Sequence, residues 1–166
     1  MTITMNKLHY FFTFAFVLLA FTSCLDDAVM SPGFAIVTPL ERTSQAGVKD
    51  TVLLSDTLLV GDTVRAGVVL NGYYDYLTSF IVSADESKVR CSLAWDEEDS
   101  MYLAEDANPE IGKLTFAPQG VYACYTTLQY VPQDSGLHKI EMVLTSAAEN
   151  PYTTASGHFF IVAKKP

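Results

Sequence analysis

Cys24 has the most specific setting of the side chains in this sequence that could do chemistry. Lys7 precedes an apolar run over residues 8–21, and the small residues Thr22-Ser23 lead directly into the Cys24 thiol. A basic start, an apolar run and small residues before a cleavage point are typical of a secretory signal peptide. We therefore expect residues 1–23 to be removed, so that the mature chain begins with a thiol that can be acylated.

Two other interpretations of this segment are open. An uncleaved membrane anchor is one, although the apolar run falls short of the roughly 18 to 20 residues that span a bilayer. A plain secretory signal is the other, although it would need no thiol. Phe21-Thr22-Ser23-Cys24 resembles the lipobox of bacterial lipoproteins, with Phe where Leu is usual. The resemblance implies that Cys24 carries a diacylglycerol and a further fatty acid such as palmitate, because one chain binds a membrane only marginally.

The residues after Cys24 bear on where the protein is located. Leu25-Asp26-Asp27 resembles the short acidic export sequence of surface lipoproteins of the Bacteroides group. This resemblance implies a protein held on the outer membrane by its lipid anchor and exposed at the cell surface; the alternative is that the acidic residues only solvate a tether. Ser31-Pro32-Gly33 and Thr38-Pro39 are turn-forming. We expect the acylated cysteine and a tether over residues 24–47.

The mature chain would be strongly acidic. Loss of Lys7 leaves nine basic residues against 19 acidic ones, a formal charge of about −10. Such an excess of carboxylates argues against binding to nucleic acid. Residues 48–166 are enough for one domain and too few for two.

Alternation of apolar and polar side chains predicts strands in this domain. Between Val64 and Leu70 every second residue is apolar, up to the turn at Asn71-Gly72. Further strands are expected over residues 76–84, 89–95, 121–131, 139–145 and 157–163. With no helices between the strands, a parallel α/β plan is excluded. We expect an all-β, antiparallel sandwich of about seven to eight strands.

The segment from Asp134 to Ile140, with sequence DSGLHKI, resembles the D-x-G-x-Y-x-C segment of the immunoglobulin-like superfamily. In that family the Tyr forms a hydrogen bond at the corner before the penultimate strand. The resemblance implies an immunoglobulin-like β-sandwich. Here His138 takes the place of the Tyr, and Ile140 replaces the Cys of the usual disulfide. We expect His138 to donate a hydrogen bond to a backbone carbonyl.

Cys91 and Cys124 fall in expected strands, and their positions suggest that both face one core. Outside the cytoplasm they could form a single disulfide, and the alternative is two buried thiols. No His and base arrangement accompanies either thiol, so we expect no catalytic cysteine. The sequence also lacks G-x-S-x-G, H-E-x-x-H and phosphate-binding glycine motifs. We therefore expect no catalytic residues and no enzyme activity.

No metal site or cofactor is expected. His138 and His158 lack a clustered third ligand for zinc. The densest acidic stretch is Asp96-Glu97-Glu98-Asp99 with Glu105, Asp106 and Glu110. It lacks the alternating ligand order of a calcium loop, so we expect a solvated surface loop.

Four tyrosines are the candidate ligand-binding residues. Tyr73, Tyr74 and Tyr76 follow the Asn71-Gly72 turn, and Tyr152 lies in the loop before the last strand. Exposed tyrosines can stack on sugars or anchor a protein interface, although they can also simply cover the ends of the sandwich. We expect a non-catalytic module that binds a glycan or a surface protein, with a structural or adhesive subunit as the alternative. A flat aromatic platform would favour a glycan, and an unprotected strand edge would favour an assembly subunit.

Overall fold

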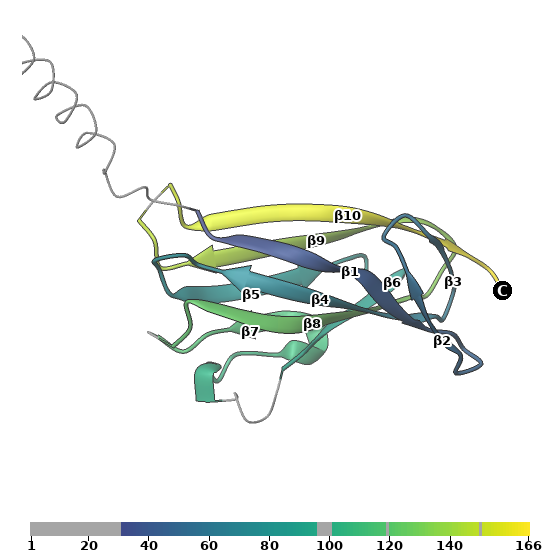
Figure 1. The fold of residues 1–166 in the computed structure, drawn as a ribbon, viewed down its shortest axis with the longest axis horizontal. Coiled ribbons are helices and arrows are strands. Elements are labelled where there is room, and N and C mark those ends of the chain that lie inside the picture. Colours follow the sequence, from purple (N-terminus) through teal and green to yellow (C-terminus); the bar gives the residue numbers. More distant parts are fainter. Residues whose placement is uncertain (1–30, 96–100, 119, 150) are drawn as a thin grey trace, which may run out of the picture.

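The computed structural model describes residues 31–95, 101–118, 120–149 and 151–166. They form two five-stranded sheets packed face to face (Figure 1). The strands are β1 (Gly33–Thr43), β2 (Lys49–Val52), β3 (Thr57–Leu59), β4 (Thr63–Asn71), β5 (Leu77–Ser83), β6 (Val89–Ala94), β7 (Lys113–Thr115), β8 (Ala123–Pro132), β9 (Gly136–Ser146) and β10 (Thr154–Lys164). A short 3-10 helix, η2 (Pro109–Ile111), precedes β7.

The strand order is that of an immunoglobulin domain. One sheet has the order β2-β1-β4-β8-β6 and the other β3-β10-β9-β5-β7. Constant-type immunoglobulin domains have the sheets A-B-E-D and G-F-C, to which β1-β4-β8-β6 and β10-β9-β5 correspond. The chain is therefore an all-β, immunoglobulin-like sandwich, as predicted. The described strands exceed the expected seven to eight for two reasons. β2, β3 and β7, of three or four residues each, are too short to show alternation, and β1 lies where a tether was expected.

The core lies between the sheets and follows the alternation within each strand. In β4, the side chains of Val64, Ala66, Val68 and Leu70 are fully buried, as predicted. They belong to one apolar cluster with residues of the opposite sheet, among them Phe80 in β5. A slip of one residue would turn the whole set outward. Core burial therefore fixes the register of β4 against its neighbours β1 and β8.

The predicted tether is wrong in its second half. Residues 24–30 lie outside the described part of the chain, but Gly33–Thr43 forms β1 and pairs with β4. Leu40 of this strand is part of the core. Pro39, which suggested a loop, lies at a register shift in the pairing with β4, where a strand tolerates proline. The sandwich therefore already includes β1, and does not begin at residue 48.

Arg42 joins three segments near the end of β1. Its Nε donates to Oδ1 of Asp50 in β2 over 2.8 Å, and its Nη1 lies 3.8 Å from Oδ2 of Asp62, just before β4. Asp62 is buried, and its Oδ2 also accepts the backbone N–H of Leu59. The hydrogen bond from Arg42 lowers the pKa of Asp50. The guanidinium thus ties the β1–β2 hairpin to the start of β4.

Candidate functional site

The disulfide considered for Cys91 and Cys124 is not formed. Both side chains pack against the core, as the sequence predicted. Cys91 in β6 lies opposite Tyr130 in β8, however, six residues along β8 from Cys124. At about 3.4 Å per residue that offset is roughly 20 Å, whereas the Cα atoms of a disulfide lie within about 7 Å. Alternation left the disulfide and the two thiols open as alternatives, because it indicates which face a residue occupies and not how far along the strand its partner lies.

Cys91 is also a poor nucleophile. Burial raises the pKa of its thiol to about 12, because a thiolate loses its hydration in the apolar surroundings. The reactive form of a cysteine is the thiolate. The thiol is therefore protonated at neutral pH and suits a structural position.

The expected hydrogen bond of His138 is present. Nε2 of His138 lies 2.8 Å from the carbonyl oxygen of Asp134, so the ring nitrogen is the donor. The side chain is buried at the start of β9, which corresponds to strand F of the immunoglobulin sandwich. His138 thus closes the corner that a tyrosine closes in the family that the segment resembles.

The four candidate tyrosines lie in two loops at one end of the sandwich (Figure 1). Tyr73 and Tyr74 lie in the β4–β5 loop and are exposed, and Tyr152 is exposed in the β9–β10 loop. The backbone N–H of Ala147 donates to the carbonyl of Tyr76 over 2.8 Å, which joins the two loops. The structure therefore brings the four residues to the same end.

Tyr76 differs from the other three because another ring covers it. It stacks on Tyr122, which precedes β8, with ring centroids 4.1 Å apart. A hydrogen bond between the two side chains raises the pKa of Tyr122. Tyr76 is therefore engaged in packing, as the alternative interpretation held, whereas Tyr122 stays exposed to solvent.

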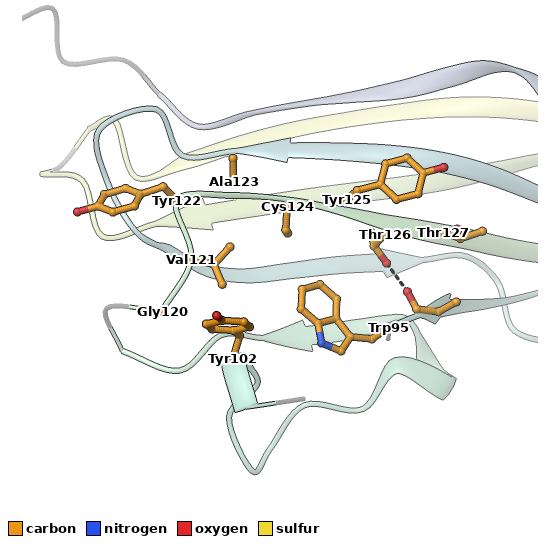
Figure 2. A pocket seen from close by; sticks show the side chains of 11 residues that line it. Trp95, Tyr102, Gly120, Val121, Tyr122, Ala123, Cys124, Tyr125, Thr126 and Thr127 are labelled. Atoms are coloured by element: carbon orange, nitrogen blue, oxygen red, sulfur yellow. Dashed lines mark hydrogen bonds between the residues drawn. The ribbon is translucent and has the colours of Figure 1, made fainter. Parts of the chain in front are cut away.

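A groove of about 980 Å³ opens beside the first half of β8 (Figure 2). Four of the side chains that line it are aromatic, namely Trp95, Tyr102, Tyr122 and Tyr125. We call it the aromatic groove. Figure 2 shows Trp95 and Tyr102 on one side of β8, whereas Tyr125 points to the other side. The groove therefore wraps around an edge of the strand.

Trp95 and Tyr102 are positioned by contacts with residues outside the aromatic groove. The ring of Trp95 meets Phe116 edge to face, with centroids 5.8 Å apart. Its Nε1 is buried without a hydrogen-bond partner among the described residues, which is uncommon for a buried donor. The carbonyl of Tyr102 accepts the backbone N–H of Ala117 over 2.8 Å. The segment before β8 therefore fixes the place of Tyr102.

The floor of the aromatic groove is a strand edge. β6 pairs with β8 only as far as Ala94, which lies opposite Thr127. The register between the two strands ends at this pair and does not reach Ala123 or Tyr125. The hydroxyl of Thr126 donates to the carbonyl of Ala94 over 2.7 Å and marks the point where the pairing ends. We call the positions of Ala123 and Tyr125 the open edge of β8.

The direction of the backbone groups along the open edge follows from alternation. The backbone N–H of Gln133 donates to the carbonyl of Lys88 on the β6 side. The carbonyl of Tyr122 accepts the backbone N–H of Gly72 on the β4 side. Successive residues of a strand point their N–H and C=O groups to opposite sides. The N–H and C=O groups of Ala123 and Tyr125 therefore face the aromatic groove.

Tyr125 is 61% exposed, and its ring lies over β4. A Cβ atom added to Gly67 would come within 2.1 Å of the Tyr125 hydroxyl oxygen. The ring can therefore take this place only because residue 67 has no side chain. The arrangement leaves an aromatic face exposed on the outer surface of the sheet.

Several predictions fall outside what the structure describes. Cys24 and the acidic run 96–99 are among the residues not described.

The described part of the acidic stretch includes one ion pair. Asp106 pairs with Lys113 at 2.7 Å, which lowers the pKa of the Asp106 carboxyl group. Within the described ranges, no three His, Cys, Asp or Glu side chains converge on a common metal position, and no helix has the length and apolar character to cross a bilayer.

No family model matches this chain, and no curated protein matches it. The solved structures similar to this chain include the following three. A family 123 glycoside hydrolase from Clostridium perfringens has 10% identity and a TM-score of 0.42, over 82% of this chain and 28% of that one. The PapD-like domain 7 of human CEP192 has 10% identity and a TM-score of 0.33, over 67% and 78%. The CooA pilin subunit of enterotoxigenic Escherichia coli has 11% identity and a TM-score of 0.35, over 78% of this chain and 99% of that one. At these values none bears on function.

The aromatic groove was not predicted from the sequence. By sequence, Trp95 and Tyr122 belong to the strands expected over residues 89–95 and 121–131, and Tyr102 belongs to the acidic stretch between Asp96 and Glu110. The one indication was that the strand pattern stops after Trp95, but the sequence did not show that this strand pairs with the longer β8. A shorter strand beside a longer one leaves part of the longer one uncovered.

Proposed function

We propose that this protein is a lipid-anchored, non-catalytic interaction module of the outer membrane, which binds an extended segment of a surface protein along the open edge of β8. The observation that carries the proposal is that backbone groups of Ala123 and Tyr125 face a groove lined by aromatic side chains. The acyl anchor on Cys24 is part of the proposal and is supported by the sequence around that residue.

Strand addition would use the ordinary chemistry of a sheet. A segment entering the aromatic groove would lie alongside β8 and would bond to the N–H and C=O groups of Ala123 and Tyr125. Each hydrogen bond contributes about 0.5–1.5 kcal/mol net, so side chains must supply most of the affinity. Alternate side chains of the segment would contact Trp95 and Tyr102 on one side and Tyr125 on the other.

Photo-crosslinking in intact cells tests the proposal. A benzophenone amino acid replaces Tyr125 at the open edge, or Phe160, an exposed aromatic residue on the outer face of the other sheet. We expect a covalent protein adduct from position 125 and none from position 160. Equal adducts from both positions, or none from either, would contradict the proposal.

A backbone test separates strand addition from side-chain contact. In the crosslinker background, Ala123→Pro removes one N–H that faces the groove, at the first residue of a strand, where proline is tolerated. Ala123→Val keeps the N–H and serves as the matched control. We expect the adduct to be lost in the Pro variant and kept in the Val variant. Loss in neither, with both variants folded by circular dichroism, would exclude strand addition.

A fluorescence measurement shows whether the ligand is a glycan instead. Trp95 is the only tryptophan of the sequence and lies in the aromatic groove, so its emission reports on occupancy. If polysaccharides shift that emission and no protein adduct forms, the groove binds glycans and the proposed protein ligand is wrong.

A further inference from the structure

We infer that the end of the sandwich that carries Tyr73, Tyr74 and Tyr152 rests on the membrane surface. The inference depends on the proposed acylation of Cys24. It identifies a second interaction surface, distinct from the aromatic groove, with a lipid bilayer as its partner.

The chain enters the sandwich at this end. Gly33, the first residue of β1, lies opposite Asn71, the last residue of β4. The β4–β5 loop with Tyr73 and Tyr74 begins directly after Asn71. The hydroxyl oxygen of Tyr73 would lie 3.4 Å from a Cβ atom added to Gly33. A tyrosine of the loop therefore lies beside the point where the tether meets the fold.

The tether is too short for the molecule to stand on the membrane with the opposite end of the sandwich facing the bilayer. From Cys24 to Gly33 the chain advances nine residues and spans at most about 30 Å, whatever its conformation. β9 and β10 have eleven residues each, or roughly 36 Å of strand. Turning the molecule over would require a tether longer than the sandwich, so an acylated Cys24 keeps the tyrosine end near the bilayer.

The chemistry of this end suits the boundary between lipid and water. Tyr74 is 79% exposed, and Tyr73 and Tyr152 are also exposed. Tyrosine is enriched at membrane interfaces because its ring is apolar and its hydroxyl is polar. The described residues of the two loops include the acidic Asp75 and Glu149 and no Lys or Arg. Contact should therefore not require anionic lipids.

A bilayer at this end would leave the aromatic groove accessible from the side. Tyr122 lies at the membrane end of the groove, and Thr127 lies farther along β8. A partner segment would then be bound close to the membrane, beside the sandwich.

Tryptophan scanning of the full-length acylated protein tests the inference. Tyr74→Trp places a reporter at the tyrosine end, and Leu137→Trp places one at the opposite end, where the native residue is 66% exposed. Each variant is reconstituted in phosphatidylcholine vesicles that contain a phosphatidylcholine with a nitroxide near its headgroup. The emission of wild-type protein, due to Trp95, is subtracted. We expect the reporter at residue 74 to shift to shorter wavelength and to be quenched, and the reporter at residue 137 to do neither.

The outcomes separate this inference from the proposed anchor. Mass spectrometry of residue 24 decides whether it is acylated, and an unmodified residue removes the anchor and the inference together. If Cys24 is acylated and both reporters are quenched equally, or neither is, the anchor stands and the inference is wrong. Binding to the same vesicles with an unquenched residue 74 would likewise overturn it.

Discussion

His138 donates from Nε2 to the carbonyl oxygen of Asp134, four residues earlier, over 2.8 Å. This bond closes the turn between β8 and β9 from within, because the His138 side chain is buried. Nδ1 of the same ring has no hydrogen-bond partner among the described residues. Nε2 is thus the ring nitrogen that contributes a hydrogen bond to the fold.

Two ring substitutions at residue 138 test this role. His138→Tyr supplies a hydroxyl donor, as in the resembling family, whereas His138→Phe offers a ring of similar size with no donor. We expect the Tyr variant to be more stable than the Phe variant by about 1 kcal/mol, the usual net value of one hydrogen bond. Urea unfolding measures the difference. Equal stabilities would show that the corner does not depend on the donor.

The Arg42 cluster should respond unequally to loss of its members. We expect Arg42→Gln to lower the free energy of unfolding by about 1–3 kcal/mol, because the buried Asp62 loses its neighbouring cation. Asp50→Asn should cost less, since its ion pair is partly exposed to solvent. The pKa of Asp50 is lowered in the fold, so its contribution is present above 3.8 and lost as the pH falls through the lowered value. Urea titrations of both variants above and below that pH would check this.

Gly67→Ala should displace Tyr125 without unfolding the protein. The added methyl group meets the end of a movable side chain, so the stability should change by less than about 1 kcal/mol. The phenol would swing away from β4 and react faster with tetranitromethane, as measured by mass spectrometry. Tyr74, which is 79% exposed, is the internal reference. An unchanged nitration ratio would mean that Tyr125 does not lie over Gly67 in solution.

The Cys91 thiol should make stability fall at high pH. Its pKa is raised from 9.0 to about 12 by burial. The unfolded chain therefore loses the proton first, and the contribution is present below 9.0 and lost as the pH rises toward 12. Wild-type stability should fall more steeply over that range than that of Cys91→Ala, by up to about 1.4 kcal/mol per pH unit. Parallel curves in urea unfolding would contradict the raised pKa.

The sequence determined the strands whose alternation is regular. The apolar positions of β4 are all buried, and the segment that begins β9 forms its corner through His138 as expected. These features are local, because side-chain direction alternates within a strand and the corner bond spans four residues. The all-β class followed from them, since strands without intervening helices bury their apolar faces by packing sheet against sheet.

Tertiary structure alone decided the features that depend on pairing between distant segments. β1 is a strand despite Pro39 because β4 supplies its partner. Cys91 and Cys124 share a core but not a register position, so no bond joins them. The aromatic groove lies where the described pairing of β6 with β8 ends, at Ala94 and Thr127. Alternation fixes the face on which a side chain lies, whereas the offset between neighbouring strands is fixed only when their buried faces pack together.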